Sequence, residues 1–385
     1  MHYQQIKTEL EKLISFPSVS NRPTEAVIAY LAEILENLGF DINYYYDAND
    51  TTKANLFASI GPKDSDGLLL SGHIDVVPTD GQSWHSDPFK LLEKDHCFFA
   101  RGSVDMKGFI AVVISVLKSI KLTQIKKELV LLWTYDEEIG CIGSRTFVQS
   151  FHKDNQNQRY LPKFCIIGEP TKQQMIIQHS GIFLFDILLK GKAAHSSLPS
   201  LGISAISDAN KIINELEAIA DSFRQRSADE IVRKSLAYPY TTINIATITG
   251  GITYNIVPEH CKIGVSVRPI PGVSVAEVKA EIFSRLYRLN LKSKIEIIET
   301  IAVNGLKTSV DTQCVNWLKP YSVDESPKAV AYCTDGGNLA ELDLECVIFG
   351  PGSIEQAHKP NEYIQISELI TYRDKLEQMI RNRLC

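Results

Sequence analysis

The chain of 385 residues has no excess of basic residues, no long apolar run and no paired cysteine motif. Its 40 Lys and Arg against 46 Asp and Glu give a net charge of -6, which argues against a nucleic-acid partner because phosphate contacts need a basic surface. No run approaches the ~20 apolar residues of a membrane span, and the polar N-terminus carries no secretion signal. The eight cysteines are irregularly spaced, which predicts reduced thiols. We therefore expect a cytoplasmic protein with no nucleic-acid and no membrane partner.

The remaining composition is that of a folded globular protein. Hydrophobic residues make up 44% and charged residues 22% of the sequence, which excludes a disordered or collagen-like chain. Area scaling predicts that about three quarters of the surface of the unfolded chain becomes buried, more than a single core usually takes. We therefore expect two domains.

Helix and strand patterns alternate in the first part of the chain. Apolar residues with helical spacing occupy 4–15, 24–38, 106–119 and 142–151. Continuous apolar runs, typical of strands buried on both faces, occupy 68–70, 129–133 and 164–167. This alternation predicts an α/β domain with a largely parallel sheet flanked by helices.

A different order of elements begins near residue 179. Residues 179–299 are predicted to form strand, helix, strand, strand, helix and strand, the β-α-β-β-α-β order of an independent α+β module. The α/β pattern then resumes with an apolar strand at 346–349 and a final helix at 366–383. The module is therefore predicted to be inserted into a larger domain that consists of residues 1–178 and 300–385.

Side chains that can bind metals follow the predicted strands of the larger domain. The carboxyl ends of parallel strands meet at one edge of a sheet, where ligands of α/β proteins bind. Alone, each residue would be an ordinary hydrogen-bonded His or an acid that caps a helix. Together they form a mixed nitrogen and oxygen set that suits zinc, with cobalt or manganese as substitutes, and one shared carboxylate would let two ions lie ~3.5–4 Å apart. The candidates are His73, Asp105, Glu137, Glu138, Glu169 and His358.

Local spacing suggests separate chemical roles for some of these residues. His73 and Asp75 are two residues apart, so in a strand both side chains leave the same face, and Asp75 can accept the second ring N–H of His73. Glu137 and Glu138 are neighbours and point to opposite sides of an extended chain. One can bind metal while the other remains free as the general base of a metal-assisted hydrolysis.

Five short segments carry a resemblance to a known family. They are residues 72–78 (GHIDVVP), 105–108 (DMKG), 137–138 (EE), 168–170 (GEP) and 357–358 (AH). Their order and spacing resemble the dizinc amidohydrolases and exopeptidases that include aminoacylase, carboxypeptidase G, succinyl-diaminopimelate desuccinylase and acetylornithine deacetylase. The resemblance implies a hydrolase with two Zn²⁺ per subunit and a cis peptide between Asp105 and Met106. It assigns His73 and Glu169 to one ion, Glu138 and His358 to the other, Asp105 as the bridge and Glu137 as the general base.

The inserted module contains three further segments that resemble this family. Residues 191–196 (GKAAHS) place His195 where the family has a histidine that reaches the partner subunit's active site and stabilises the oxyanion. Residues 250–258 and 267–272 place Asn255 and Arg268 where the substrate carboxylate is oriented and bound. The resemblance therefore implies a homodimer in which the inserted module serves for dimerisation.

A narrower similarity bears on the substrate. Residues 350–353 (GPGS), 356–358 (QAH) and 332–334 (YCT) look most like acetylornithine deacetylases, which release acetate from Nα-acetyl-L-ornithine in arginine synthesis. The alternatives are succinyl-diaminopimelate desuccinylase, a broad Nα-acyl amino acid deacylase, and a metal-stabilised binding protein without turnover, although the last should lack Glu137. The deacetylases usually carry Glu after the residue equivalent to Thr334, whereas this chain has Asp335. Asp335 is thus either the contact for the substrate ammonium or a turn residue before two glycines.

Overall fold

The computed structural model describes residues 2–63, 66–154 and 161–385. These residues divide into two compact units. The first consists of Met1–Ile177, Thr308–Lys328 and Thr334–Cys385, and the second of Gln178–Lys307 and Ala329–Cys333. The second unit includes residues 300–307 and 329–333 in addition to the predicted 179–299, and its strand β12 (Lys294–Val303) extends past its predicted end at residue 299.

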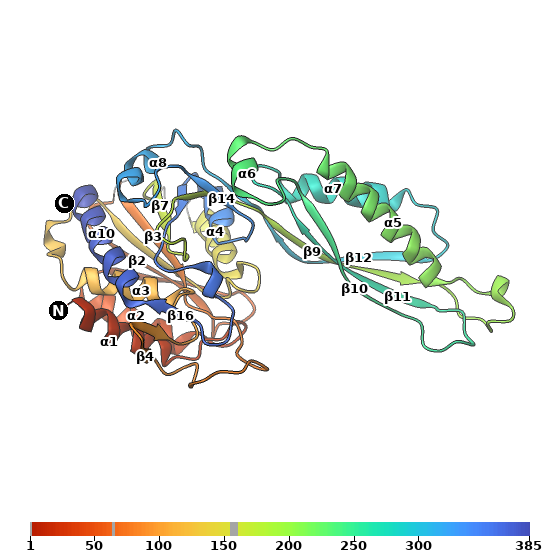
Figure 1. Ribbon diagram of the computed structural model, residues 1–385, viewed down its shortest axis with the longest axis horizontal. Coiled ribbons are helices and arrows are strands. Elements are labelled where there is room, and N and C mark those ends of the chain that lie inside the picture. The colour runs from red at the N-terminus through yellow and green to blue at the C-terminus, as the bar shows by residue number, and fades with distance from the viewer. Residues whose placement is uncertain (1, 64–65, 155–160) are drawn as a thin grey trace. The chain divides into compact units, whose positions relative to one another are not determined.

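A mixed sheet forms the centre of the first unit (Figure 1). Its four central strands, in the order β6-β3-β7-β15, are parallel to one another, and the outer strands are antiparallel. This arrangement confirms the predicted largely parallel sheet. Within the described residues the full order is β1 (Asp41–Tyr46), β2 (Ala54–Ile60), β6 (Leu129–Thr134), β3 (Leu68–His73), β7 (Phe164–Ile167), β15 (Glu345–Ile348), β8 (Ile176–His179) and β13 (Leu306–Lys307), with β14 (Lys328–Val330) paired to β8.

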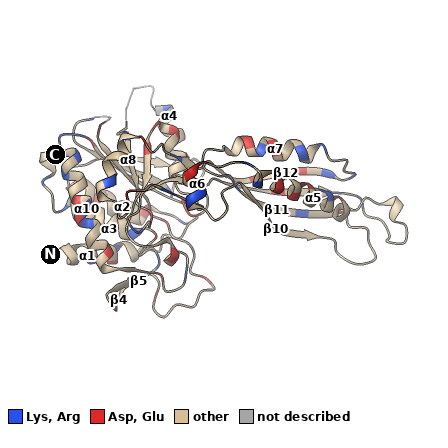
Figure 2. Ribbon diagram, turned by 45° about the horizontal axis from the view of Figure 1, so that its top comes forward, with Lys and Arg blue, Asp and Glu red and all other residues tan. Residues whose placement is uncertain are grey.

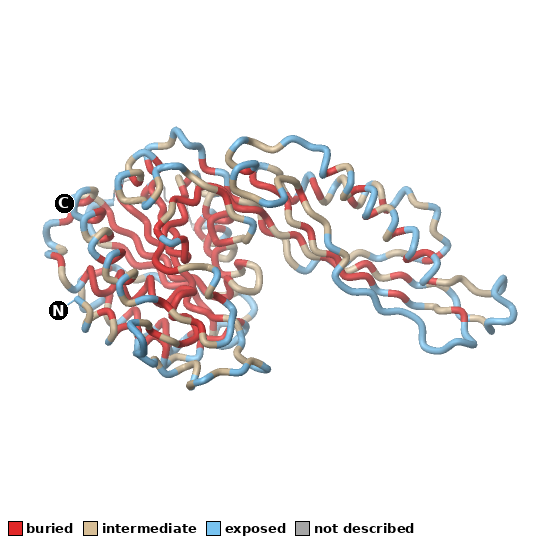
Figure 3. Tube along the Cα trace, in the orientation of Figure 1, coloured by how far each residue is buried: buried red, intermediate tan, exposed pale blue. Residues whose placement is uncertain are grey.

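Helices cover both faces of this sheet. Phe109 of α3 packs edge-on against Trp133 of β6, whereas Phe147 of α4 stacks on Phe57 of β2. Trp133 pairs with Leu56, the neighbour of Phe57, so the two contacts lie on opposite faces. The central strands are buried along their length (Figure 3). The helices of this unit are α1 (His2–Ile14), α2 (Glu25–Asn37), α3 (Lys107–Leu117), α4 (Ile142–Asp154), α8 (Gln313–Leu318), α9 (Gly336–Leu339) and α10 (Ile366–Leu384).

A small antiparallel sheet adjoins the loops that carry the candidate ligands. It has the order β16 (Tyr363–Gln365), β5 (Cys97–Phe99) and β4 (Leu92–Lys94). Pairing of Tyr363 with Phe99 joins the segment after His358 to the segment before Asp105.

The second unit has the predicted β-α-β-β-α-β order and adds a short helix, α6 (Glu230–Ser235). Its antiparallel sheet has the order β10-β11-β9-β12, and buried residues of α5 and α7 share one hydrophobic core with β9 and β11. Charged residues of both signs lie along α5 and α7 (Figure 2). The remaining bounds are β9 (Ile182–Lys190), α5 (Ala205–Arg224), β10 (Thr242–Gly250), β11 (His260–Arg268) and α7 (Val275–Tyr287).

Two further findings concern the whole described chain. The eight cysteines are free thiols, and five of them are buried. Among the described helices, none is long and apolar enough to cross a membrane.

Candidate metal centre

Five predicted ligands come together at the carboxyl edge of the central parallel strands. His73 is the last residue of β3, Glu138 follows β6, and Glu169 follows β7. His358 lies between β15 and β16, and Asp105 lies just before α3. Because β6, β3, β7 and β15 are adjacent and parallel, their carboxyl ends open onto the same edge.

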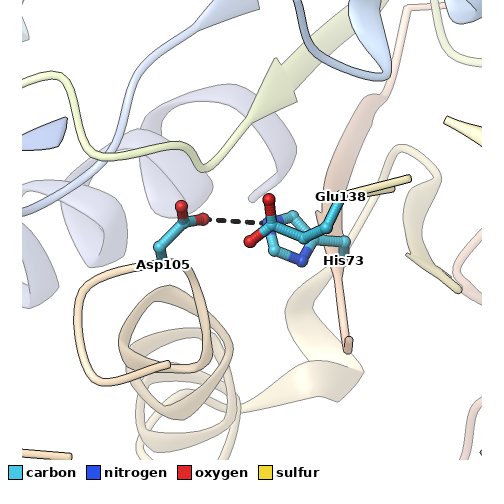
Figure 4. Close-up of side chains that lie close together, drawn as sticks. All are labelled: His73, Asp105 and Glu138. Atoms are coloured by element: carbon cyan, nitrogen blue, oxygen red, sulfur yellow. Dashed lines mark hydrogen bonds and ion pairs between the residues drawn. The ribbon is translucent and has the colours of Figure 1, made fainter. Parts of the chain in front are cut away.

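The first group of ligand atoms surrounds His73. Its Nε2 lies 2.9 Å from Oδ1 of Asp105 and 3.6 Å from Oε1 of Glu169. Figure 4 shows the Asp105 carboxylate directed at the His73 ring, with Glu138 beside them. His73, Asp105 and Glu138 each offer one ligand atom, and these atoms lie within 4.8 Å of one another. That spacing fits side chains that gather around bound cations.

The second group surrounds His358. Its Nε2 lies 2.9 Å from Oε2 of Glu138 and 3.2 Å from Oδ2 of Asp105. The two oxygens of Asp105 therefore face different imidazoles, Oδ1 toward His73 and Oδ2 toward His358. A carboxylate in this position can bridge two cations. The predicted cis peptide joins Asp105 to Met106.

Asp75 supports this site differently from the prediction. Nδ1 of His73 lies 2.9 Å from the backbone carbonyl oxygen of Asp75 and 3.6 Å from its carboxylate. The carboxylate instead accepts hydrogen bonds from the backbone N–H groups of Glu137 and Glu138 and from the Ser20 hydroxyl. The backbone carbonyl of Asp75 therefore fixes the His73 tautomer, while its carboxylate positions the turn after β6.

Glu137 lies in the turn after β6 and is buried. Its side chain is 9% exposed, and the Cys141 thiol donates to its Oε1 at 3.6 Å. Ligand atoms of Glu137, His73 and Glu169 also lie within 4.8 Å of one another. Glu137 is thus near the metal-ligand cluster, whereas Glu138 is the residue that contacts His358.

The crowding of acids in a buried site shifts their pKa values strongly. Burial raises the pKa of Glu137 and of Glu169, and neighbouring carboxylates raise both further. Burial together with the nearby Asp105 carboxylate raises the pKa of Glu138 to about 7. The His73 and His358 imidazoles overcome the burial of Asp105 and lower the pKa of its carboxyl.

The neighbouring carboxylates raise the pKa values of both histidines. Hydrogen bonds to Asp105 and Glu138 raise the pKa of His358 to about 10. Burial opposes protonation of His73, but the carboxylates of Glu169 and Asp105 raise its pKa well above the usual range. Buried carboxylates in this number need protons or cations as partners. Oε1 of Glu138 is buried and has no hydrogen-bond partner in the described part of the chain, as expected of an oxygen that can accept a cation. The residues therefore fit a divalent metal.

Thr334 and Asp335 belong to the first unit and are both buried. Asp335 is 2% exposed and accepts a hydrogen bond of 2.6 Å from the hydroxyl of Thr134, at the end of β6. Its carboxylate, the Cys141 thiol and Glu137 form one group within 4.8 Å. Asp335 therefore lies in the protein interior beside Glu137.

The other three predicted residues belong to the second unit. His195 is exposed, and its Nδ1 lies 2.7 Å from the hydroxyl of Ser197. A β-bridge pairs His195 with Ile256, which places it next to Asn255. Arg268 ends β11, is half-buried, and has no ion-pair partner among the residues that the structure describes. The fold thus brings His195 and Asn255 together.

Comparison with known proteins places this site in a family. A model of the Peptidase family M20/M25/M40 matches residues 69–382. The chain is a member of the M20/M25/M40 peptidase family. The acetylornithine deacetylase of Proteus mirabilis is 32% identical over 381 residues, which cover 96% of this chain and 95% of that protein. The acetylornithine deacetylase of Buchnera aphidicola is also 32% identical, with 97% of each chain covered.

Solved structures of this family share the fold. A metallo-carboxypeptidase of Sulfolobus solfataricus superimposes with a TM-score of 0.80 at 21% identity, covering 98% of this chain and 99% of the other. A Bacillus subtilis protein described as a dinuclear metal binding peptidase gives a TM-score of 0.67 at 14% identity, with coverage of 98% and 97%. The predictions of an α/β fold with an α+β insertion and of a hydrolase are confirmed.

The sequence analysis did not identify several residues that support the centre of this M20 protein. Ser20 binds the Asp75 carboxylate, Cys141 contacts Glu137, and Glu362 accepts hydrogen bonds from the loop that carries Asp105. Glu362 lies four residues after His358 and Cys141 three after Glu138. Proximity to a ligand in sequence is the signal for Cys141 and Glu362, whereas nothing in the sequence near Ser20 connects it with the ligands.

Proposed function

We propose that this protein is a metal-dependent amidohydrolase that converts Nα-acetyl-L-ornithine and water into L-ornithine and acetate. The observation that carries the proposal is the placement of the Asp105 carboxylate between His73 and His358, with Glu138, Glu169 and a separate acid, Glu137, around it. The two relatives described above are named acetylornithine deacetylases, and each matches this chain over nearly its whole length. This similarity favours acetylornithine over a succinylated substrate.

We infer that two divalent ions, zinc in the first instance with cobalt as a substitute, bind to this site. His73 and Glu169 would hold one ion and Glu138 and His358 the other, with Asp105 shared between them. The likeness to a dinuclear metal binding peptidase supports two ions rather than one. When bound, the ions would lower the pKa of water and polarise the acetyl carbonyl.

In this proposal Glu137 performs the proton transfers. Its carboxylate would take a proton from the attacking water and return it to the nitrogen of the leaving ornithine. Burial and the neighbouring carboxylates raise its pKa, which makes it a stronger base than an exposed glutamate. Asp75 would keep Glu137 and Glu138 in place through their backbone N–H groups.

The second unit would supply the remaining contacts. Arg268 would bind the substrate carboxylate through its planar guanidinium, Asn255 would orient the substrate, and His195 would donate a hydrogen bond to the oxyanion. Support for His195 comes from its exposed ring, whose Nδ1 is engaged by Ser197, leaving Nε2 as the atom for substrate.

We further propose a homodimer formed by the second unit. β10 is an edge strand whose residues are mostly exposed, and an edge strand can pair with a second copy. Exposed apolar side chains gather on this strand, on segments near it and at the start of α5, which favours burial against a partner. They are Leu198, Leu201, Ile206, Ile248, Ile252 and Ile256.

Substrate hydrolysis tests the proposal directly. The zinc- or cobalt-loaded protein should hydrolyse Nα-acetylornithine with a higher kcat/KM than Nα-acetylmethionine or N-succinyl-diaminopimelate. A preference for either of the other substrates would reject the acetylornithine assignment but not the hydrolase. Light scattering should give twice the chain mass of 43.1 kDa, and a monomer at assay concentration would reject the dimer.

A further inference from the structure

A buried ion pair outside the ligand set holds the loop that carries Asp105. Glu362 is 1% exposed, and its Oε2 lies 2.7 Å from Nη1 of Arg101, which is also 1% exposed. The same carboxylate accepts three backbone hydrogen bonds. Oε2 receives the N–H of Gly102 at 3.1 Å, and Oε1 receives those of Val104 at 2.9 Å and Asp105 at 3.2 Å. One carboxylate therefore binds three of the four backbone N–H groups from Gly102 to Asp105.

Arg101 extends the same network toward His358. Its Nη2 donates to Oε1 of Gln82 at 2.7 Å, and Nε2 of Gln82 donates to the backbone carbonyl of His358 at 3.1 Å. Nη1 of Arg101 also lies 3.4 Å from the carbonyl oxygen of Lys359. The guanidinium thus contacts Lys359 directly and His358 through Gln82, next to a His358 backbone whose φ of +63° is strained for a residue other than glycine.

The network joins the two segments whose ligands must face each other. Arg101 precedes Asp105 by four residues, and Glu362 follows His358 by four. Oδ2 of Asp105 and Nε2 of His358 are 3.2 Å apart. The ion pair thus accepts the backbone N–H of one ligand directly and reaches the backbone carbonyl of the other ligand through Gln82, which is more than stabilisation of the fold alone requires.

We propose that the Arg101–Glu362 ion pair is a positioning device that fixes the spacing of Asp105 and His358 and thereby sets the affinity of the site for metal. The inference rests on the proposed function, because it takes both residues as metal ligands. Partners that orient ligands from outside the coordination sphere typically contribute 10–100-fold to metal affinity. The affinity for the ion bound by His358 and Asp105 should depend most on the Arg101–Glu362 pair, because this pair holds both segments that carry those two ligands.

Zinc titration of the chelator-treated full-length protein by calorimetry tests this inference. Glu362→Gln keeps the size of the side chain but replaces one acceptor oxygen by a donor, so it cannot serve all four of its present partners. We expect the weaker zinc site to lose 10–100-fold in affinity. We also expect kcat at limiting zinc to fall and to recover with excess zinc, with KM for acetylornithine unchanged.

Two variants separate positioning from stability. Gln82→Ala removes the half-buried side chain that joins Arg101 and the Trp84 indole N–H to the His358 carbonyl, but it leaves the Arg101–Glu362 ion pair in place. It should therefore lower zinc affinity in the same direction with a near wild-type melting temperature. Glu355→Gln is the matched control, because Glu355 lies in the same loop, is exposed and pairs only with Lys172 and Ser353 among the described residues. It should leave both zinc constants unchanged.

The outcomes distinguish this inference from the proposed function. Wild-type protein should bind two zinc ions, and His358→Ala should lose one. Failure of either result would overturn the ligand assignment and the positioning role with it. If both results hold but Glu362→Gln and Gln82→Ala keep wild-type zinc constants, only the positioning role is overturned. A lower melting temperature with unchanged zinc affinity would likewise reduce the ion pair to a structural one.

Discussion

Replacement of Glu137 by glutamine should separate chemistry from metal binding in this site. The substitution keeps the shape of a side chain that is only 9% exposed but removes its capacity to accept a proton. General acid–base catalysis contributes 10²–10⁴-fold, so kcat should fall at least ~100-fold, which corresponds to about 2.7 kcal/mol of transition-state stabilisation. KM should change little because the amide occupies the same volume.

The structure also predicts what Glu137→Gln should leave intact. Glu138, not Glu137, lies 2.9 Å from the His358 imidazole, so both metal ions should remain bound. Removal of one negative charge from a cluster of buried carboxylates should not lower the melting temperature of the metal-free protein, since like charges destabilise one another there.

Steady-state release of ornithine, metal content by elemental analysis and thermal unfolding measure these three quantities on one preparation. Glu138→Gln serves as the contrasting variant and should lose metal. Loss of one metal equivalent from Glu137→Gln would show that the two glutamates exchange roles. Activity within tenfold of wild type, with metal retained, would show that another group is the base.

Three further predictions concern the remaining residues. His195→Ala should reduce kcat ~10²–10³-fold with metal retained. Mixing this variant with Glu137→Gln protein should restore part of the activity, because a hybrid dimer contains one site with both groups intact. No recovery after verified subunit exchange would place His195 in its own subunit's site or outside catalysis. Arg268→Lys should cost about 1–3 kcal/mol in kcat/KM for every Nα-acyl amino acid tested, because the bidentate fork is lost, and an unchanged kcat/KM would remove Arg268 from the site. The pKa of His358 is raised to about 10, so its imidazole is protonated in the metal-free protein at pH 8 and must lose that proton to bind zinc. Calorimetry in buffers of different ionisation enthalpy should therefore detect proton release, and zinc affinity should rise with pH.

Local patterns in the sequence were sufficient to predict most elements and to indicate that the candidate ligands gather at one edge of the sheet. The run at 129–133 became β6 because a strand buried on both faces needs apolar residues throughout, and the first helix expected within residues 179–299 became α5. His73, Glu138, Glu169 and His358 could be proposed as ligands because they follow predicted strands, and parallel strands end at a common edge, whereas Asp105 precedes a helix.

Contacts between distant segments could not be predicted in the same way. The order β6-β3-β7-β15 depends on which strands pair, and no local pattern carries that information. The hydrogen bond between Arg101 and Glu362 spans 261 residues, and each residue alone is an ordinary charged side chain. The sequence alone does not indicate which donor binds the Asp75 carboxylate. In the fold, the backbone N–H groups of Glu137 and Glu138 donate to it, and the His73 ring contacts the Asp75 backbone carbonyl instead.

Asp335 shows how burial changes the interpretation of a specificity residue. An acid that selects the ornithine ammonium must reach the bound substrate, but Asp335 is 2% exposed and its Oδ2 already accepts the Thr134 hydroxyl at 2.6 Å. Burial raises its pKa, and any loss of its carboxylate would act first on the end of β6 and on neighbouring Glu137. A residue that acts through the general base affects every substrate equally. Selection of acetylornithine over acetylmethionine would then have to come from another acid, so the ratio of the two kcat/KM values in Asp335→Asn protein decides between a substrate contact and a support for Glu137.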